Sequence, residues 1–153
     1  MGIKILGENR KARHEYYVLE SLEAGIALKG TEIKSIRKGK FNINDSYCQI
    51  KKGEIILVNA HISKYEQGNI NNHDELRDRK LLLHKSEIRK WSYRLKKEER
   101  LTIVPLKIYL KQGLCKVEVA LCKGKKLYDK REDEKIREEK LRADSALKQN
   151  GAV

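Results

Sequence analysis

Residues 103–122, IVPLKIYLKQGLCKVEVALC, carry the clearest structural signal in the chain, because apolar and polar residues alternate on both sides of Gln112–Gly113. The apolar positions are Val104, Leu106, Ile108, Leu110, Cys115, Val117, Val119 and Leu121. Alternation of this kind is typical of strands with one buried face, and a short turn containing glycine joins antiparallel neighbours. The segment therefore predicts a β-hairpin with one face toward a core.

Further strands are expected on the N-terminal side of this hairpin. Residues 46–62 predict a second hairpin that turns at Lys51–Lys52–Gly53. Its second strand has a nearly continuous apolar run over 55–58, as in a strand covered on both faces. Residues 14–29 predict two strands, HEYYVLE and AGIALK. The sole proline, Pro105, is expected near the start of its strand, where a missing N–H donor costs least.

Helical signals are fewer. A short helix is expected over 31–38, between two glycines, and a second is expected to begin at Ser86 as its N-cap. The second helix places apolar residues on one face, with the tryptophan in the core: Ile88, Trp91 and Leu95. Together these elements predict a mainly β fold, an oligonucleotide-binding-type closed barrel of six or seven strands with a few short helices. A split barrel or an open α+β sheet also fits the pattern.

The charge of the chain indicates a polyanionic partner. The sequence has 35 basic and 22 acidic residues, a net charge of +13. Residues 123–153 contribute 10 basic and 7 acidic residues, a net +3, which leaves +10 for residues 1–122. A basic folded domain of this size points to nucleic acid. A membrane surface fits less well, because no basic stretch alternates with an apolar helical face.

The composition changes at Lys123. From there to residue 153 the chain consists mostly of charged residues, and its large aliphatic residues do not recur at three- and four-residue steps: Leu127, Ile136, Leu141 and Leu147. The residue types nevertheless favour helix. We therefore expect residues 1–122 to form the barrel, and residues 123–153 to be a tail that is disordered when free and helical against a partner.

Other classes of protein are disfavoured. No apolar run approaches the roughly 20 residues of a spanning helix, and the N-terminus has no stretch expected of a signal peptide. Three cysteines, an odd number, predict reduced thiols in the cytoplasm. The four histidines are not at metal-ligand spacing, so no metal or cofactor is expected. His61 with Asp45 or Glu54 is the one imaginable nuclease pair, and we do not expect an enzyme.

Several residues are candidates for RNA binding. Basic residues gather around the short helix and its following glycine: Lys34, Arg37, Lys38 and Lys40. A second basic group, Arg77, Arg79 and Lys80, precedes Leu81–Leu82–Leu83–His84. Tyrosines in strands, Tyr16, Tyr17 and Tyr47, are able to stack on bases, although strand aromatics are more often core. Glu23 repels phosphate, yet its carboxylate is able to accept a hydrogen bond from a base edge or a 2′-hydroxyl.

Three segments in order, 9–47, 59–88 and 106–132, resemble the small protein B family, the SsrA-binding proteins. The resemblance rests on the strings LEAG, GTEIKS, DSY, NAHIS, RKLLLH and KGKKLYDKR. It implies an oligonucleotide-binding-type barrel with a basic tail that binds the tRNA-like domain of transfer-messenger RNA. The complex is delivered to stalled ribosomes for trans-translation, where the tail forms a helix in the vacant message channel beside small-subunit RNA. A permanently bound ribosomal or assembly protein and an RNA-processing enzyme are the competing classes.

The resemblance also implies roles for individual residues. Contacts with the tRNA-like domain are implied for Glu23 in LEAG, Leu82 and His84 in RKLLLH, Tyr16 in HEYY and Tyr47 in DSY. Contacts near the decoding centre are implied for the KGKKLYDKR string: Lys123, Gly124, Lys125, Lys126, Tyr128, Asp129, Lys130 and Arg131.

Overall fold

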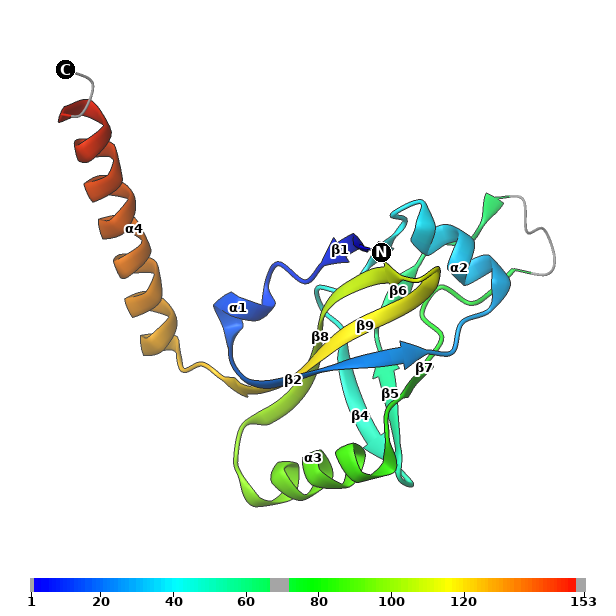
Figure 1. The fold of residues 1–153 in the computed structure, drawn as a ribbon. Coiled ribbons are helices and arrows are strands. Elements are labelled where there is room, and N and C mark those ends of the chain that lie inside the picture. The colour runs from blue at the N-terminus through cyan, green and yellow to red at the C-terminus, as the bar shows by residue number, and fades with distance from the viewer. Residues whose placement is uncertain (1, 67–71, 151–153) are drawn as a thin grey trace.

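The computed structural model describes residues 2–66 and 72–150, and its strands form a sheet that closes on itself (Figure 1). The sheet consists of β1 (Ile3–Glu8), β2 (Tyr16–Ile26), β4 (Tyr47–Lys51), β5 (Glu54–Val58), β7 (Arg79–Leu82), β8 (Leu101–Lys111) and β9 (Leu114–Gly124). Their order is β1-β8-β4-β5-β7-β2-β9, and β8 also pairs with β9. This last pairing joins the two sides of the sheet into a barrel, with β1 alongside β8. The predicted fold class is confirmed.

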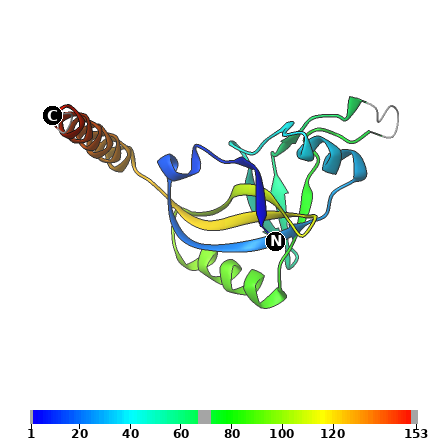
Figure 2. The same ribbon diagram turned by 45° about the horizontal axis from the view of Figure 1, so that its top comes forward.

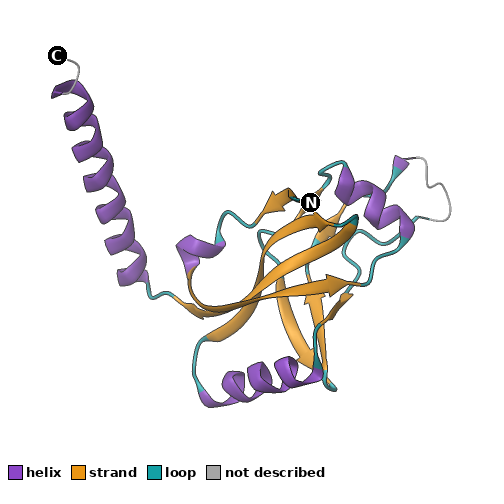
Figure 3. Ribbon diagram, in the orientation of Figure 1, coloured by secondary structure: helices purple, strands orange, loops and turns teal. Residues whose placement is uncertain are grey.

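The helices lie around and beyond the barrel (Figure 3). They are α1 (Ala12–Glu15), α2 (Gly30–Arg37), α3 (Lys85–Lys97) and α4 (Leu127–Asn150), and a small second sheet pairs β3 (Phe41–Asn42) with β6 (His61–Ile62). The core receives Ile36 from α2 and both Ile88 and Trp91 from α3. The predicted core position of Trp91 is therefore confirmed. The helix α4 extends away from the barrel (Figures 1 and 2).

Both predicted hairpins are present, and their turns have a common backbone conformation. Lys52 and Gly53 join β4 to β5 with φ values of 52° and 75°, and Gln112 and Gly113 join β8 to β9 with φ values of 53° and 75°. Two successive residues with positive φ match the twist of antiparallel strands, and glycine adopts this conformation without steric cost. In β5, however, Ile55 and Leu57 are buried while Ile56 and Val58 are half-buried, so this strand is not fully covered on both faces.

A β-bulge in β8 corrects the predicted faces of the first hairpin. The register shifts between Pro105 and Lys107, so Ile103 and Ile108 both reach the main core although their spacing is odd. Val104 and Leu106 instead pack with Ala120 in a second cluster beneath α1. Pro105 lies within the strand rather than near its start, at an irregularity that tolerates the missing N–H.

Asn9 satisfies the backbone at this bulge. Its side-chain amide donates to the Pro105 carbonyl at 3.0 Å, and its backbone N–H donates to the Leu106 carbonyl at 2.7 Å. Two carbonyls that the irregular strand would otherwise leave unpaired are thus bonded. The predicted faces of β9 are confirmed, because Val117, Val119 and Leu121 all enter the main core.

Three other expectations are revised. Residues 14–29 contain one strand, β2 (Tyr16–Ile26), with a register shift between Val18 and Glu20, rather than two strands. The N-cap of α3 is His84, whose backbone N–H donates to the Glu87 carboxylate at 3.1 Å, and not Ser86. The strand β9 continues to Gly124 and so includes the first two residues of the predicted tail, Lys123 and Gly124.

A buried ion pair links α2 to β7. The Arg79 Nη2 and Glu32 Oε2 atoms are 2.6 Å apart, and both side chains are fully buried. Arg79 also donates to the Ala60 carbonyl at 2.6 Å, and Arg77 Nη2 reaches the other Glu32 oxygen at 2.6 Å. Burial raises the pKa of Glu32, but hydrogen bonds from Arg77, the Lys29 N–H and Arg79 outweigh that effect and lower it overall.

Replacing Glu32 with glutamine should lower the free energy of unfolding by about 3–5 kcal/mol, because Arg79 would keep a buried charge without its partner. Urea unfolding followed by circular dichroism measures this loss. Glu54→Gln is the matched control, since Glu54 pairs with Lys80 at 3.1 Å with both side chains about half exposed; it should cost at most about 1 kcal/mol. Equal losses for the two variants would contradict the structural role of the buried pair.

Candidate nucleic-acid interface

Glu23 lies on β2 within a hydrogen-bonded group on the outer face of the barrel. The Tyr109 hydroxyl donates to Glu23 Oε1 at 2.6 Å, and Lys111 Nζ lies 3.3 Å from Oε2. The hydrogen bond from Tyr109, with help from Lys111, lowers the pKa of Glu23 below its ordinary value. Burial, followed by the bond to Glu23, raises the pKa of Tyr109. Glu23 is therefore an ionised, oriented carboxylate at neutral pH, and its oxygens are able to accept further hydrogen bonds.

The side chain of Leu82 lies next to this group on β7. Gly25 pairs with Leu82, and a Cβ added at Gly25 would lie 3.2 Å from the Leu82 Cβ. The glycine thus permits a close approach of the two strands. Leu82 is 54% exposed, and it lines an apolar hollow together with Arg37 of α2. The predicted residues Glu23, Leu82 and Arg37 are therefore brought to neighbouring positions, although they are far apart in the sequence.

The basic side chains around α2 extend in two different directions. Arg37 extends toward the β8–β9 turn, where its Nη2 atom lies 3.5 Å from the Gly113 carbonyl. Lys34 and Lys38 instead have their ammonium groups 5.2 and 5.0 Å from the centre of the Tyr65 ring. Both contacts are cation–π interactions. The helix therefore presents one cation beside the apolar hollow and two beside an aromatic ring.

The remaining barrel candidates occupy different surroundings. Lys40 lies 3.6 Å from Glu66, and Lys80 pairs with Glu54. His84 is exposed at the start of α3, immediately after β7. Tyr16 and Tyr47 line one hollow, and burial raises the pKa of Tyr16. These two tyrosines are therefore neighbours, at the opposite end of β2 from Glu23.

The first tail residues are bound to the start of the barrel. Lys123 and Gly124 pair with Tyr17 and Tyr16 as the end of β9. The Lys125 backbone N–H donates to the Glu15 carbonyl at 2.9 Å, and its ammonium group donates to the Arg13 carbonyl at 3.0 Å. The same ammonium lies 4.9 Å from the centre of the Tyr17 ring.

Residues further along belong to α4. Lys130 and Arg131 lie in its first turns, and the side chains of Tyr128 and Asp129 fall outside those that the structure describes. The roles predicted for KGKKLYDKR remain predictions. His14 of α1 lies 3.4 Å from Glu134 of α4, a second link between the barrel and the tail.

Two other sequence-based candidates have structural roles. Arg79, grouped with Lys80 as a basic surface, is buried against Glu32 and cannot face a phosphate. His61 pairs with Glu75 at 2.6 Å, rather than with Asp45 or Glu54, so the imagined nuclease pair is wrong. Within residues 2–66 and 72–150, no cluster of His, Cys, Asp or Glu has the grouping needed to hold a metal. No helix in the same ranges is both long and apolar enough to cross a membrane.

Sequence reasoning missed two aromatic residues of this surface. Tyr109 is 5% exposed and orients Glu23, but in the sequence it appears as one polar position of an alternating strand. Tyr65 receives two lysines from α2, and nothing in the intervening sequence predicts that contact. The positions of the charged residues along β8 could have predicted that Tyr109 lies beside Glu23 only if the bulge at Leu106 had been known.

Comparison with known proteins gives a consistent answer. Residues 6–149 match the family described as SmpB protein. The SsrA-binding protein of Pelotomaculum thermopropionicum is 50% identical over 97% of this chain and 97% of its own length, and that of Geobacillus thermodenitrificans is 53% identical over 98% and 96%. A chain in the solved structure described as "tmRNA-SmpB: a journey to the center of the bacterial ribosome" is 48% identical. It covers 82% of this chain and 92% of its own, with a TM-score of 0.67.

The match covers nearly the whole length of this chain and of its relatives, and it includes the barrel and most of the tail. The resemblance stated from the sequence is therefore confirmed. The chain belongs to the SmpB protein family, that of the SsrA-binding proteins.

Proposed function

We propose that this protein binds transfer-messenger RNA and delivers it to stalled ribosomes for trans-translation. The observation that carries this function is the identity of 50% or more to SsrA-binding proteins over nearly the whole chain. The similar chain in the tmRNA–SmpB structure supports the ribosome as the second partner. The net charge of +13 is of the sign that both RNA partners require.

The barrel grips the tRNA-like domain at the end formed by β2, β7 and α2. There Glu23 supplies an oriented acceptor, Leu82 an exposed apolar contact, and Arg37 a cation beside the same hollow. The other proposed contacts surround this region or extend it along the barrel: Tyr16, Lys34, Lys38, Lys40, Tyr47, Lys80 and His84. Acceptors and apolar groups add selectivity to a phosphate attraction that by itself does not distinguish RNAs.

The tail acts in the ribosome, and residues 1–122 act on transfer-messenger RNA. We assign small-subunit RNA contacts near the decoding centre to residues 123–126, 128 and 129–131, with α4 in the vacant message channel. In this proposal the tail is largely disordered in the free protein and is held in the helical form, α4, by the channel, because its charged surface needs partners to offset the entropy of ordering. Messenger RNA already in the channel excludes the helix, so the tail binds only ribosomes whose message channel is empty.

The proposed work is binding and delivery in the cytoplasm, without catalysis by this chain. The SmpB family is an RNA-binding family. In this proposal the chemical steps of trans-translation are carried out by the ribosome and by the delivered RNA.

Sequencing the RNA that copurifies with the protein tests the function directly. A transfer-messenger species should dominate, and the protein should be enriched on stalled ribosomes. A constant amount of protein on all ribosomes, with ribosomal RNA alone in the copurified fraction, would instead indicate a permanent ribosomal component.

Removing the charge of Glu23 tests the proposed grip. Glu23→Gln should weaken transfer-messenger RNA binding, although loss of a negative charge ought to strengthen a purely electrostatic complex. Glu118→Gln is the matched control, because Glu118 pairs with Glu23 across β2 and β9 and contacts Lys107 at 3.2 Å. Binding measured by fluorescence anisotropy should weaken several-fold for Glu23→Gln and should not weaken for Glu118→Gln.

Tyr109→Phe extends this test to pH. The hydroxyl lowers the pKa of Glu23, so its removal should raise that pKa toward the ordinary value. Binding that needs the carboxylate is lost as pH falls through the Glu23 pKa, and this loss should begin at a higher pH in Tyr109→Phe. Identical pH profiles, or tighter binding by Glu23→Gln, would make Glu23 an ordinary surface carboxylate.

Ending the chain after Lys126 tests the division of labour. Since β9 and the Lys125 contacts remain, this variant should fold and should bind transfer-messenger RNA as the full chain does. It should fail to support tagging of nascent chains in a reconstituted translation system. Loss of RNA binding together with tagging would refute separate roles for barrel and tail.

A further inference from the structure

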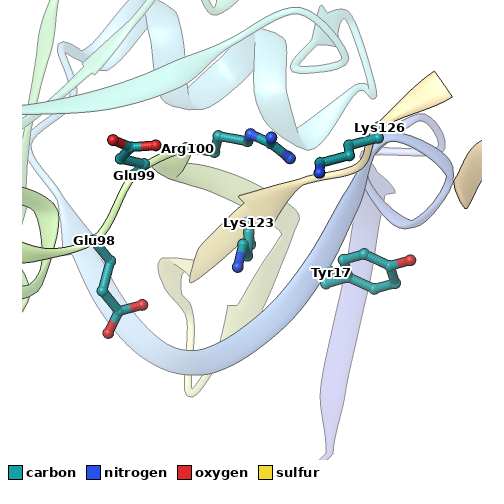
Figure 4. A pocket seen from close by; sticks show the side chains of 7 residues that line it. Tyr17, Glu98, Glu99, Arg100, Lys123 and Lys126 are labelled. Atoms are coloured by element: carbon teal, nitrogen blue, oxygen red, sulfur yellow. The ribbon is translucent and has the colours of Figure 1, made fainter. Parts of the chain in front are cut away.

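A hollow lies at the root of the tail, between the ends of β2 and β9 and the connection from α3 to β8 (Figure 4). We call it the tail-root pocket, and its lining residues are Tyr17, Glu98, Glu99, Arg100, Lys123, Gly124 and Lys126. Its volume is about 670 Å³, within the roughly 300–1,000 Å³ of ligand-binding pockets. Tyr17 and Glu23 are six positions apart on β2, about 20 Å at about 3.3 Å per residue. The pocket is therefore remote from the Glu23–Leu82 surface.

The charges of the tail-root pocket favour an anion. Three of its lining residues are basic and two are acidic, and the Glu98 carboxylate already has Arg94 at 3.3 Å. Figure 4 shows the side chains of Arg100 and Lys126 directed toward one another. A phosphate between Arg100 and Lys126 would accept charge-assisted hydrogen bonds from both side chains.

The backbone holds the basic side chains in place. Arg100 has a φ of 63°, and its carbonyl accepts a hydrogen bond from the Gly124 N–H at 3.0 Å. Lys123 is paired in register with both Tyr17 and Leu101. Lys123 thus projects from a paired strand, and Arg100 projects from a turn whose carbonyl is hydrogen-bonded to β9, as a preformed anion site requires.

An aromatic ring completes the pocket. Tyr17 is 41% exposed, and its ring has the Lys125 ammonium 4.9 Å from its centre. An exposed ring beside several cations is the combination that binds an unpaired nucleotide, because the ring stacks on the base while the cations hold the phosphate.

We propose that the tail-root pocket binds one unpaired nucleotide of small-subunit ribosomal RNA, with Arg100 at its phosphate and Tyr17 against its base. This inference rests on the proposed function, since a tail in the message channel brings its own root to the RNA wall of that channel. Transfer-messenger RNA is the less suitable source, because Glu23, Leu82 and Arg37 lie at the other end of β2, while Tyr16 and Tyr47, its proposed contacts at this end, line a separate hollow. Arg100 and Tyr17 thereby extend the ribosome-facing surface from the tail onto the barrel.

Arg100→Gln tests the site, and Arg89→Gln is the matched control. Arg89 is exposed on α3, outside the pocket, and loses the same charge. The full-length variants are titrated with purified small ribosomal subunits lacking message, and separately with transfer-messenger RNA, over a range of salt concentrations. Arg100→Gln should bind subunits about fivefold to tenfold more weakly, with a salt dependence reduced by about one phosphate contact. Its affinity for transfer-messenger RNA should equal that of Arg89→Gln.

Substitution of Tyr17 gives a second readout. Tyr17→Ala should weaken subunit binding at least fivefold, and Tyr17→Phe, which keeps the ring, should change it little. Urea unfolding confirms that each variant folds. Subunit binding by Arg100→Gln equal to that of Arg89→Gln would overturn the site, and a loss confined to transfer-messenger RNA would assign the pocket to the other partner. Failure of the wild-type protein to bind transfer-messenger RNA would refute the proposed function instead.

Discussion

The buried ion pair between Glu32 and Arg79 is the interaction on which the proposed RNA-binding end of the barrel depends. Both side chains are fully buried, and a charge in that position is tolerated only with its partner in place. Glu32 also accepts the Lys29 N–H at 2.7 Å at the start of α2, while Arg79 reaches carbonyls of the segment before β7. One interaction therefore fixes α2 against β7, and with it the relative positions of Arg37 and Leu82.

The barrel was predictable where the signal is local. Alternation along 103–122 and the glycine turns at Gly53 and Gly113 identified both hairpins, because period and turn chemistry are properties of a few neighbouring residues. The faces of β8 were not predictable in the same way. Pro105 was expected near the start of a regular strand, and the carbonyls at the shift of register are bonded by Asn9, nearly a hundred residues away in the sequence. Similarly, Arg79 looks like a surface arginine until its long-range partner Glu32 is known.

The bulge in β8 links this fold detail to the site. An uninterrupted strand that keeps Val104 beneath α1 would turn Ile108 outward and Tyr109 into the core. The shift of register exchanges these faces, so that Tyr109, itself buried, and Lys111 both reach Glu23. The sequence resemblance identified Glu23, whereas the residues that orient it follow from a backbone irregularity that no motif records. The same holds for Tyr65, which gains its two lysines only through the folding of a distant loop.

The attachment of Lys125 to the Glu15 and Arg13 carbonyls has a geometric consequence for the tail. With its first residues anchored, the 24 residues of α4 form an arm about 36 Å long, at about 1.5 Å per residue. Each position along a helix is rotated by about 100° from the one before it. In the helical state, the anchor therefore sets the angular position of the α4 backbone around the axis of the arm. Insertion or deletion of one residue between Lys125 and Tyr128 would hardly change the composition or the length of the tail. It would nevertheless rotate α4 by about 100° about its axis, so that its charged surface would face a different side of the channel.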